Sequence, residues 1–194
     1  MITCDRTQVR HYEHEGARYY SVSQVLDVLH GQPHWGSQEA MDRGTYLHRL
    51  FALCVGAFAG LCEPPAIPTE YMGYAESWTH WLTIAKPEPL AIEQRLVSTM
   101  KGLPFAGTPD LLCWMLDKNK RVRVLVDLKS GAKEKWHRVQ VQAYGKLCTH
   151  ADRLALLYLD KDGGLPTWQI VKPDPRDWAG FQHALALLQY REGL

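Results

Sequence analysis

Cysteine pairs, long apolar runs and a large net charge are all missing from this chain of 194 residues. Its cysteines are odd in number and scattered, at Cys4, Cys54, Cys62, Cys113 and Cys148, and none forms a CxxC pair. This spacing argues against a structural zinc site and against an iron–sulfur cluster. An odd set of this kind is typical of reduced thiols, so we expect a cytoplasmic protein.

Signals for a membrane or for a motor are also absent. The longest apolar run, residues 50–61, is interrupted by glycine and is too short to cross a bilayer. The first residues do not combine a basic region with an apolar one, so we expect no signal peptide. No P-loop motif occurs, so we expect neither ATP binding nor a helicase motor.

The net charge is +1, which gives no general indication of a nucleic-acid partner. The local distribution is less even, because residues 118–146 hold nine Lys or Arg but only two acids, Asp127 and Glu134. A basic face of this kind is typical of a surface that binds phosphate groups. For the four charges of residues 118–123, a solvated hairpin tip is an equally good interpretation.

Hydrophobic periodicity predicts an α/β fold in one domain spanning residues 1–194. Helical spacing occurs in five segments, at about residues 22–30, 37–59, 70–85, 136–148 and 175–191. Strand patterns occur at residues 90–99, 105–115, 121–128, 153–160 and 168–171, and a hairpin is expected over residues 8–20. This order predicts a mixed central β-sheet flanked by helices. Helical residues 21–85 should pack on a core of residues 90–194, whose first three strands should form an antiparallel meander.

Two acids and a lysine form the clearest chemical pattern. Asp127 and Lys129 end an apolar strand, and alternate residues of a strand face the same side, so both should project together. Asp110 ends the segment Gly107-Thr108-Pro109-Asp110 on the preceding strand, and should lie about 5 Å from Asp127 across an antiparallel pair. Two carboxylates can share Mg²⁺ or Mn²⁺, and a lysine beside them can orient water or offset charge during phosphodiester hydrolysis. The alternative is a surface ion pair at a strand end.

Several further motifs accompany this pattern in a fixed order. They are Gly44-Thr45-x-x-His48, Glu93, Gly107-Thr108-Pro109-Asp110, Asp127-x-Lys129-Ser130-Gly131 and Gln140-x-x-x-Tyr144. Together they resemble the RecB-type branch of the PD-(D/E)XK nucleases. Residues 20–26 are also similar to the start of phage and mitochondrial members of that branch. The resemblance implies a restriction-endonuclease-like core and a stand-alone, metal-dependent DNA exonuclease.

The resemblance also implies roles for individual residues. The implied catalytic residues are Asp110, Asp127, Lys129 and Glu93. The implied ligands for one or two Mg²⁺ or Mn²⁺ ions are His48, Asp110, Asp127 and the backbone carbonyl of Leu128. Without the resemblance, His48 would be interpreted as an ordinary helix histidine, and Glu93 as a solvent-facing residue beside Arg95.

DNA contacts are expected on the next helix and on the turn before it. Gln140 and Tyr144 lie one helical turn apart, so they share a face. Gln140 can exchange hydrogen bonds and Tyr144 can stack on a base, although Tyr144 as a core residue and Gln140 as an ordinary polar residue remain the alternative. The other expected DNA contacts are Ser130, Lys133, Lys135 and Arg138.

The resemblance implies DNA with a free end as the partner, in phage or prophage recombination or in DNA repair. A phage recombination protein and a second copy of the chain are further candidate partners, and no membrane is expected. Two alternatives keep the same site: a structure-specific endonuclease, and an inactive nuclease-like module that only binds DNA.

Overall fold

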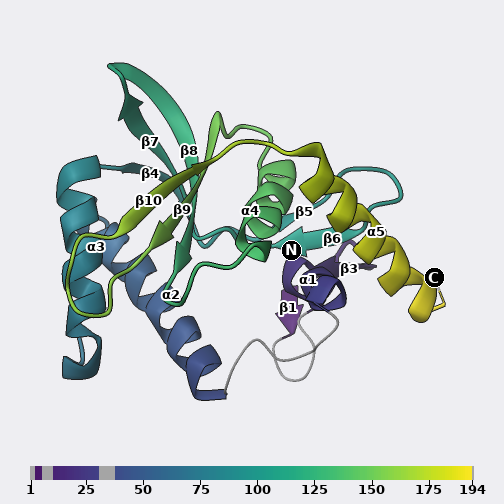
Figure 1. Cartoon of the computed structure of the whole chain (residues 1–194), viewed down its shortest axis with the longest axis horizontal. Coiled ribbons are helices and arrows are strands. Elements are labelled where there is room, and N and C mark those ends of the chain that lie inside the picture. Colours follow the sequence, from purple (N-terminus) through teal and green to yellow (C-terminus); the bar gives the residue numbers. More distant parts are fainter. Residues whose placement is uncertain (1–2, 6–10, 31–37, 194) are drawn as a thin grey trace.

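The computed structural model describes residues 3–5, 11–30 and 38–193. The chain forms a mixed α/β fold in which helices flank two five-stranded sheets (Figure 1). The mixed α/β class expected from the sequence is therefore confirmed. The expected single central sheet is replaced by two sheets, because the strands between residues 88 and 117 divide between them.

The first sheet follows the order β1-β2-β3-β6-β5. Its strands are β1 (Thr3–Asp5), β2 (His11–His14), β3 (Ala17–Ser21), β6 (Phe105–Gly107) and β5 (Leu96–Val97). Strands β3 and β6 pair in parallel, and the other pairs are antiparallel. The expected hairpin is present as β2 and β3, and both turn residues have positive φ, 52° at Glu15 and 77° at Gly16. Residues 8–10 of that prediction lie outside the described residues.

The second sheet follows the order β10-β9-β8-β7-β4. Its strands are β4 (Glu88–Ile92), β7 (Leu111–Asp117), β8 (Lys120–Lys129), β9 (Arg153–Tyr158) and β10 (Thr167–Val171). Strands β8 and β9 are parallel, and α4 (Trp136–Leu147) makes the crossover between them. The remaining pairs are antiparallel.

Two expected strands are wrong in their extent. The segment 90–99 divides into β4 and β5, and the segment 105–115 divides into β6 and β7, with each part in a different sheet. The breaks fall at Glu93, whose φ is 49°, and at Pro109, which cannot donate a ladder hydrogen bond. The expected meander therefore survives only as β4, β7 and β8.

The remaining helices match the periodicity closely. They are α1 (Val22–His30), α2 (Gln38–Phe58), the short helix η1 (Thr69–Tyr71) with α3 (Met72–Ala85), and α5 (Pro175–Arg191). At the start of α1, Ser21 and Gln24 bond each other's backbone N–H at 3.1 and 2.8 Å, which forms a capping box. No helix among the described residues combines the length and apolar character needed to cross a membrane.

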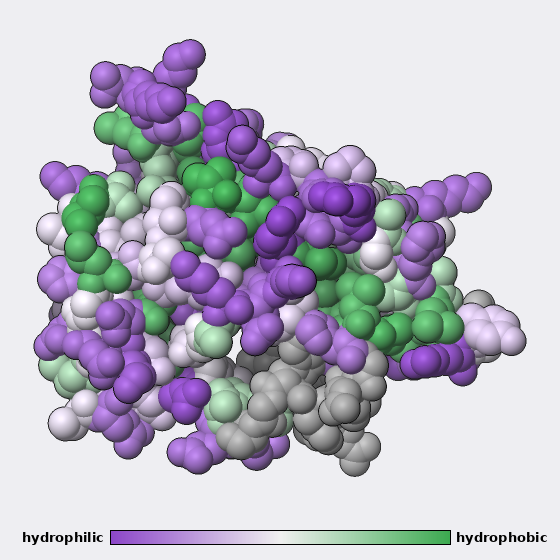
Figure 2. Space-filling view, in the orientation of Figure 1, coloured by the Kyte–Doolittle hydropathy of each residue, from purple (hydrophilic) through white to green (hydrophobic). Residues whose placement is uncertain are grey.

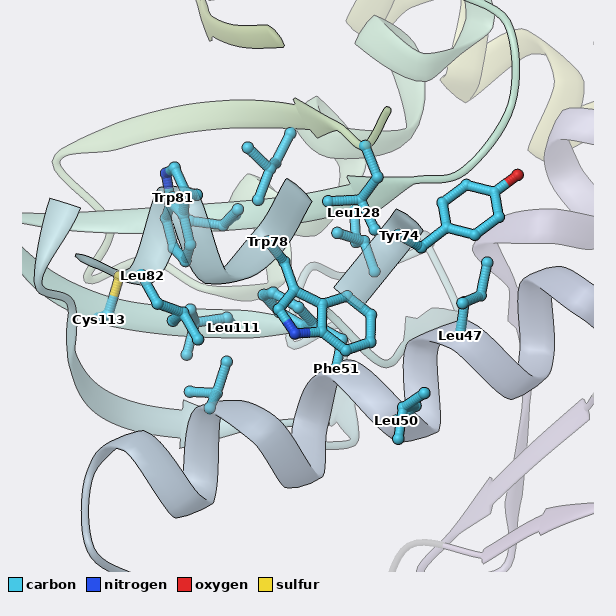
Figure 3. Close-up of a cluster of buried hydrophobic side chains, with 14 of the residues drawn as sticks. Leu47, Leu50, Phe51, Tyr74, Trp78, Trp81, Leu82, Leu111, Cys113 and Leu128 are labelled. Carbon is cyan, nitrogen blue, oxygen red and sulfur yellow. The ribbon is translucent and has the colours of Figure 1, made fainter. Parts of the chain in front are cut away.

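Helices cover both faces of the second sheet. On one face, α2 and α3 pack against alternate strand residues around the fully buried Trp78 and Phe51 (Figure 3). On the other face, α1, α4 and α5 enclose a second apolar cluster with Leu125, Leu156 and Phe181. Because successive strand residues face opposite clusters, the end of β8 is fixed from both sides.

Candidate active site

The acids predicted from the sequence meet where β7 begins and β8 ends. In the antiparallel pair β7 and β8, Leu111 lies opposite Val126, so Asp110 and Asp127 occupy adjoining positions. Asp110 is 5% exposed and Asp127 is 1% exposed, which leaves both carboxyl groups almost without water. Burial of this kind requires partners for each carboxylate.

Asp110 joins the sheet to α2. Its Oδ1 lies 2.7 Å from His48 Nδ1, and its Oδ2 accepts a hydrogen bond of 2.6 Å from the backbone N–H of Leu128. The bend after β4 contributes as well, because the backbone N–H of Glu93 donates to the Asp110 carbonyl at 2.9 Å. The amide of Leu128 thus holds Asp110, whereas the proposed metal contact of the Leu128 carbonyl stays a prediction.

Three side chains offer donor atoms suited to a metal ion. Donor atoms of His48, Glu93 and Asp110 all lie within 4.8 Å of one another. One imidazole and two carboxylates suit Mn²⁺ or Mg²⁺, and the nitrogen favours Mn²⁺. Asp127 does not belong to this group of described residues, whereas Glu93 does, although the resemblance implied it as a catalytic residue and not as a direct ligand. The metal role of Asp127 remains a prediction.

The electrostatics of the cluster differ from one carboxyl group to the other. Burial would raise the pKa of Asp110, but the charge and hydrogen bond of His48 overcome it, and the pKa is lowered. For His48, burial acts to lower the pKa, and Asp110 overcomes it, so that the pKa is raised. Burial raises the pKa of Asp127 to about 6, although the nearby Lys129 acts against this shift.

A chain of polar contacts runs from Asp127 to α4. Lys129 Nζ lies 2.8 Å from Asp127 Oδ2 and donates a hydrogen bond of 2.7 Å to Gln140 Oε1. Gln140 Nε2 in turn donates to the Tyr144 hydroxyl at 3.2 Å. Tyr144 is buried, and burial together with the charge of Asp127 raises its pKa well above the ordinary value. The shared helical face expected for Gln140 and Tyr144 is therefore directed at Lys129, and their contact with DNA stays a prediction.

The basic residues expected to bind DNA differ in their surroundings. Lys133 and Lys135 are exposed, and Lys133 Nζ lies 5.3 Å from the centre of the Tyr158 ring. Arg138 forms ion pairs with Asp174 and Asp177, at 3.4 and 3.0 Å. The DNA contacts of these cations remain predictions.

The hairpin tip between β7 and β8 is a separate basic region, far along the strands from Asp127. Figure 2 shows hydrophilic side chains at this projecting end, where Lys118 and Lys120 are exposed. Further along β8, Arg121 pairs with Glu88 and Arg123 pairs with Asp152. These contacts agree with the interpretation of a solvated hairpin tip.

The structure adds residues that the sequence patterns did not indicate. Trp136 lies beside Lys129, whose Nζ is 5.5 Å from the centre of the Trp136 ring. His137 is buried behind it and its Nδ1 lies 3.1 Å from the Tyr158 hydroxyl. Burial and the charge of Lys129 lower the pKa of His137 to about 3, so this imidazole is neutral. His137 directly precedes Arg138 in the chain, but no sequence motif had marked it as a functional residue.

Arg43 is a second addition. It directly precedes the Gly44-Thr45-x-x-His48 motif on α2, and its position beside that motif was the available signal. Its guanidinium makes no hydrogen bond or ion pair with the residues that the structure describes, and its Nε is buried.

Comparison with protein-family models gives no match, and comparison with curated proteins gives none either. Solved structures do match in fold. A candidate exonuclease from Eubacterium rectale matches with a TM-score of 0.50 and 11% identity, over 89% of this chain and 79% of that one. An alkaline exonuclease from Laribacter hongkongensis matches with a TM-score of 0.41 and 14% identity, over 89% and 87% of the two chains.

The same alkaline exonuclease in complex with dAMP matches with a TM-score of 0.42 and 16% identity, over 90% of this chain and 88% of that one. At these identities the matches concern the fold alone. The chain therefore shares its mixed α/β fold with the candidate exonuclease from Eubacterium rectale.

Proposed function

We propose that this protein is a divalent-metal-dependent deoxyribonuclease that hydrolyses phosphodiester bonds, and that it acts as an exonuclease. The observation that carries the proposal is the meeting of His48, Glu93 and Asp110 in one donor cluster beside a buried lysine. These residues come from three separate parts of the chain. Burying charged groups together is costly and does not help to form an apolar core, so the cluster indicates a functional site. The shared fold with an exonuclease-like structure is consistent with this proposal.

The donor set fits a hard divalent cation. His48, Glu93 and Asp110 would hold Mg²⁺ or Mn²⁺, with Asp127 and the Leu128 carbonyl as further ligands that we propose from the motif order. A bound ion would supply a polarised water and offset charge on the phosphate. The hydrogen bond from Leu128 N–H to Asp110 then fixes this carboxylate against the strand end, so that it keeps its orientation.

Lys129 has the position of a group that acts on the phosphate. Its ammonium is held between Asp127 and Gln140, at 2.8 and 2.7 Å, on the side of β8 that faces α4. Held in this way, it can orient the attacking water or stabilise negative charge that develops on the phosphate oxygens. Tyr144 fixes Gln140 and so positions Lys129 indirectly.

The motif order further leads us to propose membership of the RecB-type branch and a role in recombination or repair at DNA ends. The proposal is tested with linear DNA and closed circular DNA, each incubated with Mg²⁺ or Mn²⁺. We expect degradation of linear DNA that requires the metal and leaves the closed circle intact. Cleavage of closed circles would instead establish an endonuclease, and a folded protein that binds DNA and degrades neither would be an inactive binding module.

A further inference from the structure

A polar pocket of about 450 Å³ adjoins the candidate active site. One wall is the turn after Lys129, formed by Ser130 and Gly131, and another carries Arg43 from α2. Tyr74 from α3 also lines it and donates a hydrogen bond of 3.3 Å to the Ser130 carbonyl. In Figure 3 the Tyr74 hydroxyl points away from the apolar cluster. The pocket therefore opens beside the turn that follows the proposed catalytic lysine.

Arg43 is the unusual feature of this pocket. Its Nε is buried, and its guanidinium has no hydrogen bond or ion pair with any described residue. The pocket does contain acids, but Asp162 pairs with Lys161 at 3.4 Å, and Asp160 Oδ1 accepts from the backbone N–H of Asp162 at 2.9 Å. A guanidinium that pairs with no anion in the described part of the chain is suited to a phosphate that comes from outside.

An aromatic pair continues the surface from Arg43. Tyr46 lies three residues further along α2, on a neighbouring position of the same face. Its ring stacks on that of Tyr71 with centroids 4.7 Å apart and planes inclined by 28°, and Tyr46 is 37% exposed. Desolvation and then the hydrogen bond and charge of Glu70 raise the pKa of Tyr71, and the charge of Arg43 acts against this shift, which is consistent with a guanidinium close to this ring.

The backbone near these groups leaves room for a ligand. A Cβ added to Gly44, between Arg43 and His48, would meet no atom within 4 Å. The same holds at Gly131 on the facing turn. A ligand would therefore meet no nearby atom at either glycine.

We propose that Arg43 and the stacked pair Tyr46 and Tyr71 form a binding surface for single-stranded DNA that leads into the candidate active site. Arg43 binds a backbone phosphate, and an unpaired base stacks on Tyr46. The aromatic pair favours a single strand over a duplex, because bases within a duplex already stack on each other and offer no free face. The inference rests on the proposed function, since it names the form of DNA that the same site receives.

The experiment measures equilibrium binding of a fluorescent single-stranded oligonucleotide and of a blunt duplex of equal length. EDTA is present, so that metal-dependent cleavage does not occur. The variants are Arg43→Gln and Tyr46→Ala. The matched controls are Arg49→Gln, an exposed arginine further along the same helix, and Tyr190→Ala, an exposed tyrosine on α5. Thermal unfolding of each variant confirms that it is folded.

Each test variant should lose about tenfold or more in affinity for the single strand, while duplex binding and both controls change little. Salt dependence separates the two roles. Arg43→Gln should reduce the slope of log affinity against log salt concentration by about 0.7, the amount expected for one phosphate contact, and Tyr46→Ala should leave this slope unchanged. Arg43→Lys should restore part of the slope.

Single-strand binding that is equal in the wild type, Arg43→Gln and Tyr46→Ala overturns the inference, as does a wild type that binds no single strand. Degradation of linear DNA by the wild type is measured in parallel. If the wild type cleaves DNA but both variants bind the single strand as well as the wild type does, only the proposed binding surface is wrong. If the variants bind the single strand more weakly but the wild type cleaves no DNA, the proposed nuclease activity is wrong and the binding surface is supported.

Discussion

The ammonium of Lys129 and the carboxylate of Asp127 lie 2.8 Å apart on one side of β8, with Lys129 8% exposed and Asp127 1% exposed. An ion pair so well shielded from water is costly to form, and such pairs are frequent at functional sites.

Lys129→Ala should lower the rate of DNA cleavage by about 10²- to 10³-fold, because the variant loses a positioned cation beside the phosphate. Metal affinity should change little, since Lys129 is not a donor. Single-turnover cleavage and calorimetric titration with Mn²⁺ measure the two effects. Lys118→Ala, at the exposed hairpin tip, is the matched control. If Lys129→Ala cleaved DNA at the wild-type rate, Lys129 would have no part in the reaction.

Glu93→Gln should weaken Mn²⁺ binding about tenfold or more, which corresponds to roughly 1.4 kcal/mol. The reason is that Glu93 supplies one of the three clustered donor groups, and the amide is a weaker ligand than the carboxylate. Titration calorimetry measures the affinity, with Glu63→Gln in the exposed loop after α2 as the control. An unchanged affinity in Glu93→Gln together with a large loss in Asp127→Asn would place the ion nearer to β8.

Metal binding should weaken in acid. The pKa of Asp127 is raised to about 6, and only its ionised carboxylate can bind a cation or attract one nearby. As the pH rises, Asp127 and His48 both lose protons that compete with the ion, because the pKa of His48 is raised as well, so affinity should increase with pH. Below pH 6 each unit should lower affinity by about tenfold or more. Mn²⁺ titrations between pH 5 and pH 8 test this sign. An affinity that rises toward pH 5 would contradict it.

Gly107→Ala should disturb Lys129 through Tyr144. A Cβ at Gly107 would lie 2.5 Å from Tyr144 Cε1, so the ring has to move, and its hydroxyl accepts the hydrogen bond from Gln140. We expect a loss of stability of about 1–3 kcal/mol and a fall in cleavage rate that exceeds any change in Mn²⁺ affinity. Urea unfolding and single-turnover rates measure both. Gly180→Ala on α5, where a Cβ makes only an ordinary contact at 3.9 Å, should leave the cleavage rate unchanged and raise stability by up to about 1 kcal/mol, because alanine favours the helix.

Trp78→Ala should lower the free energy of unfolding by about 3–5 kcal/mol, because this side chain is 1% exposed at the centre of the apolar cluster between α3 and the second sheet. Leu116→Ala should cost less than about 0.5 kcal/mol, because Leu116 is 74% exposed. Chemical unfolding in urea compares the two. Equal losses would show that the cluster around Trp78 does not dominate stability.

Local patterns predicted most of the elements. The expected helix at residues 175–191 coincides with α5, and the expected strand at residues 121–128 lies within β8. These segments follow their own periodicity because each packs one regular face on the core. The pattern also places Asp127 and Lys129 on one side of a strand, as the structure has them.

Local sequence patterns could not predict that the strands divide into two sheets. It depends on the parallel pairing of β3 with β6, whose residues Tyr20 and Phe105 are far apart in sequence. The left-handed backbone of Glu93 also has no periodic signal, although it brings this acid to Asp110. That Arg43 has no hydrogen-bond or ion-pair partner among the described residues is also a three-dimensional property, which no local pattern predicts.

His48 and Asp110 are 62 positions apart along the polypeptide, and one belongs to a helix while the other belongs to a sheet. An ion held by both would therefore act as a reversible cross-link that closes a long stretch of backbone. Removal of the ion by a chelator would then weaken the contact between α2 and the strands. Hydrogen exchange at the amides of α2 should therefore be faster without the metal than with it, even when no nucleic acid is present.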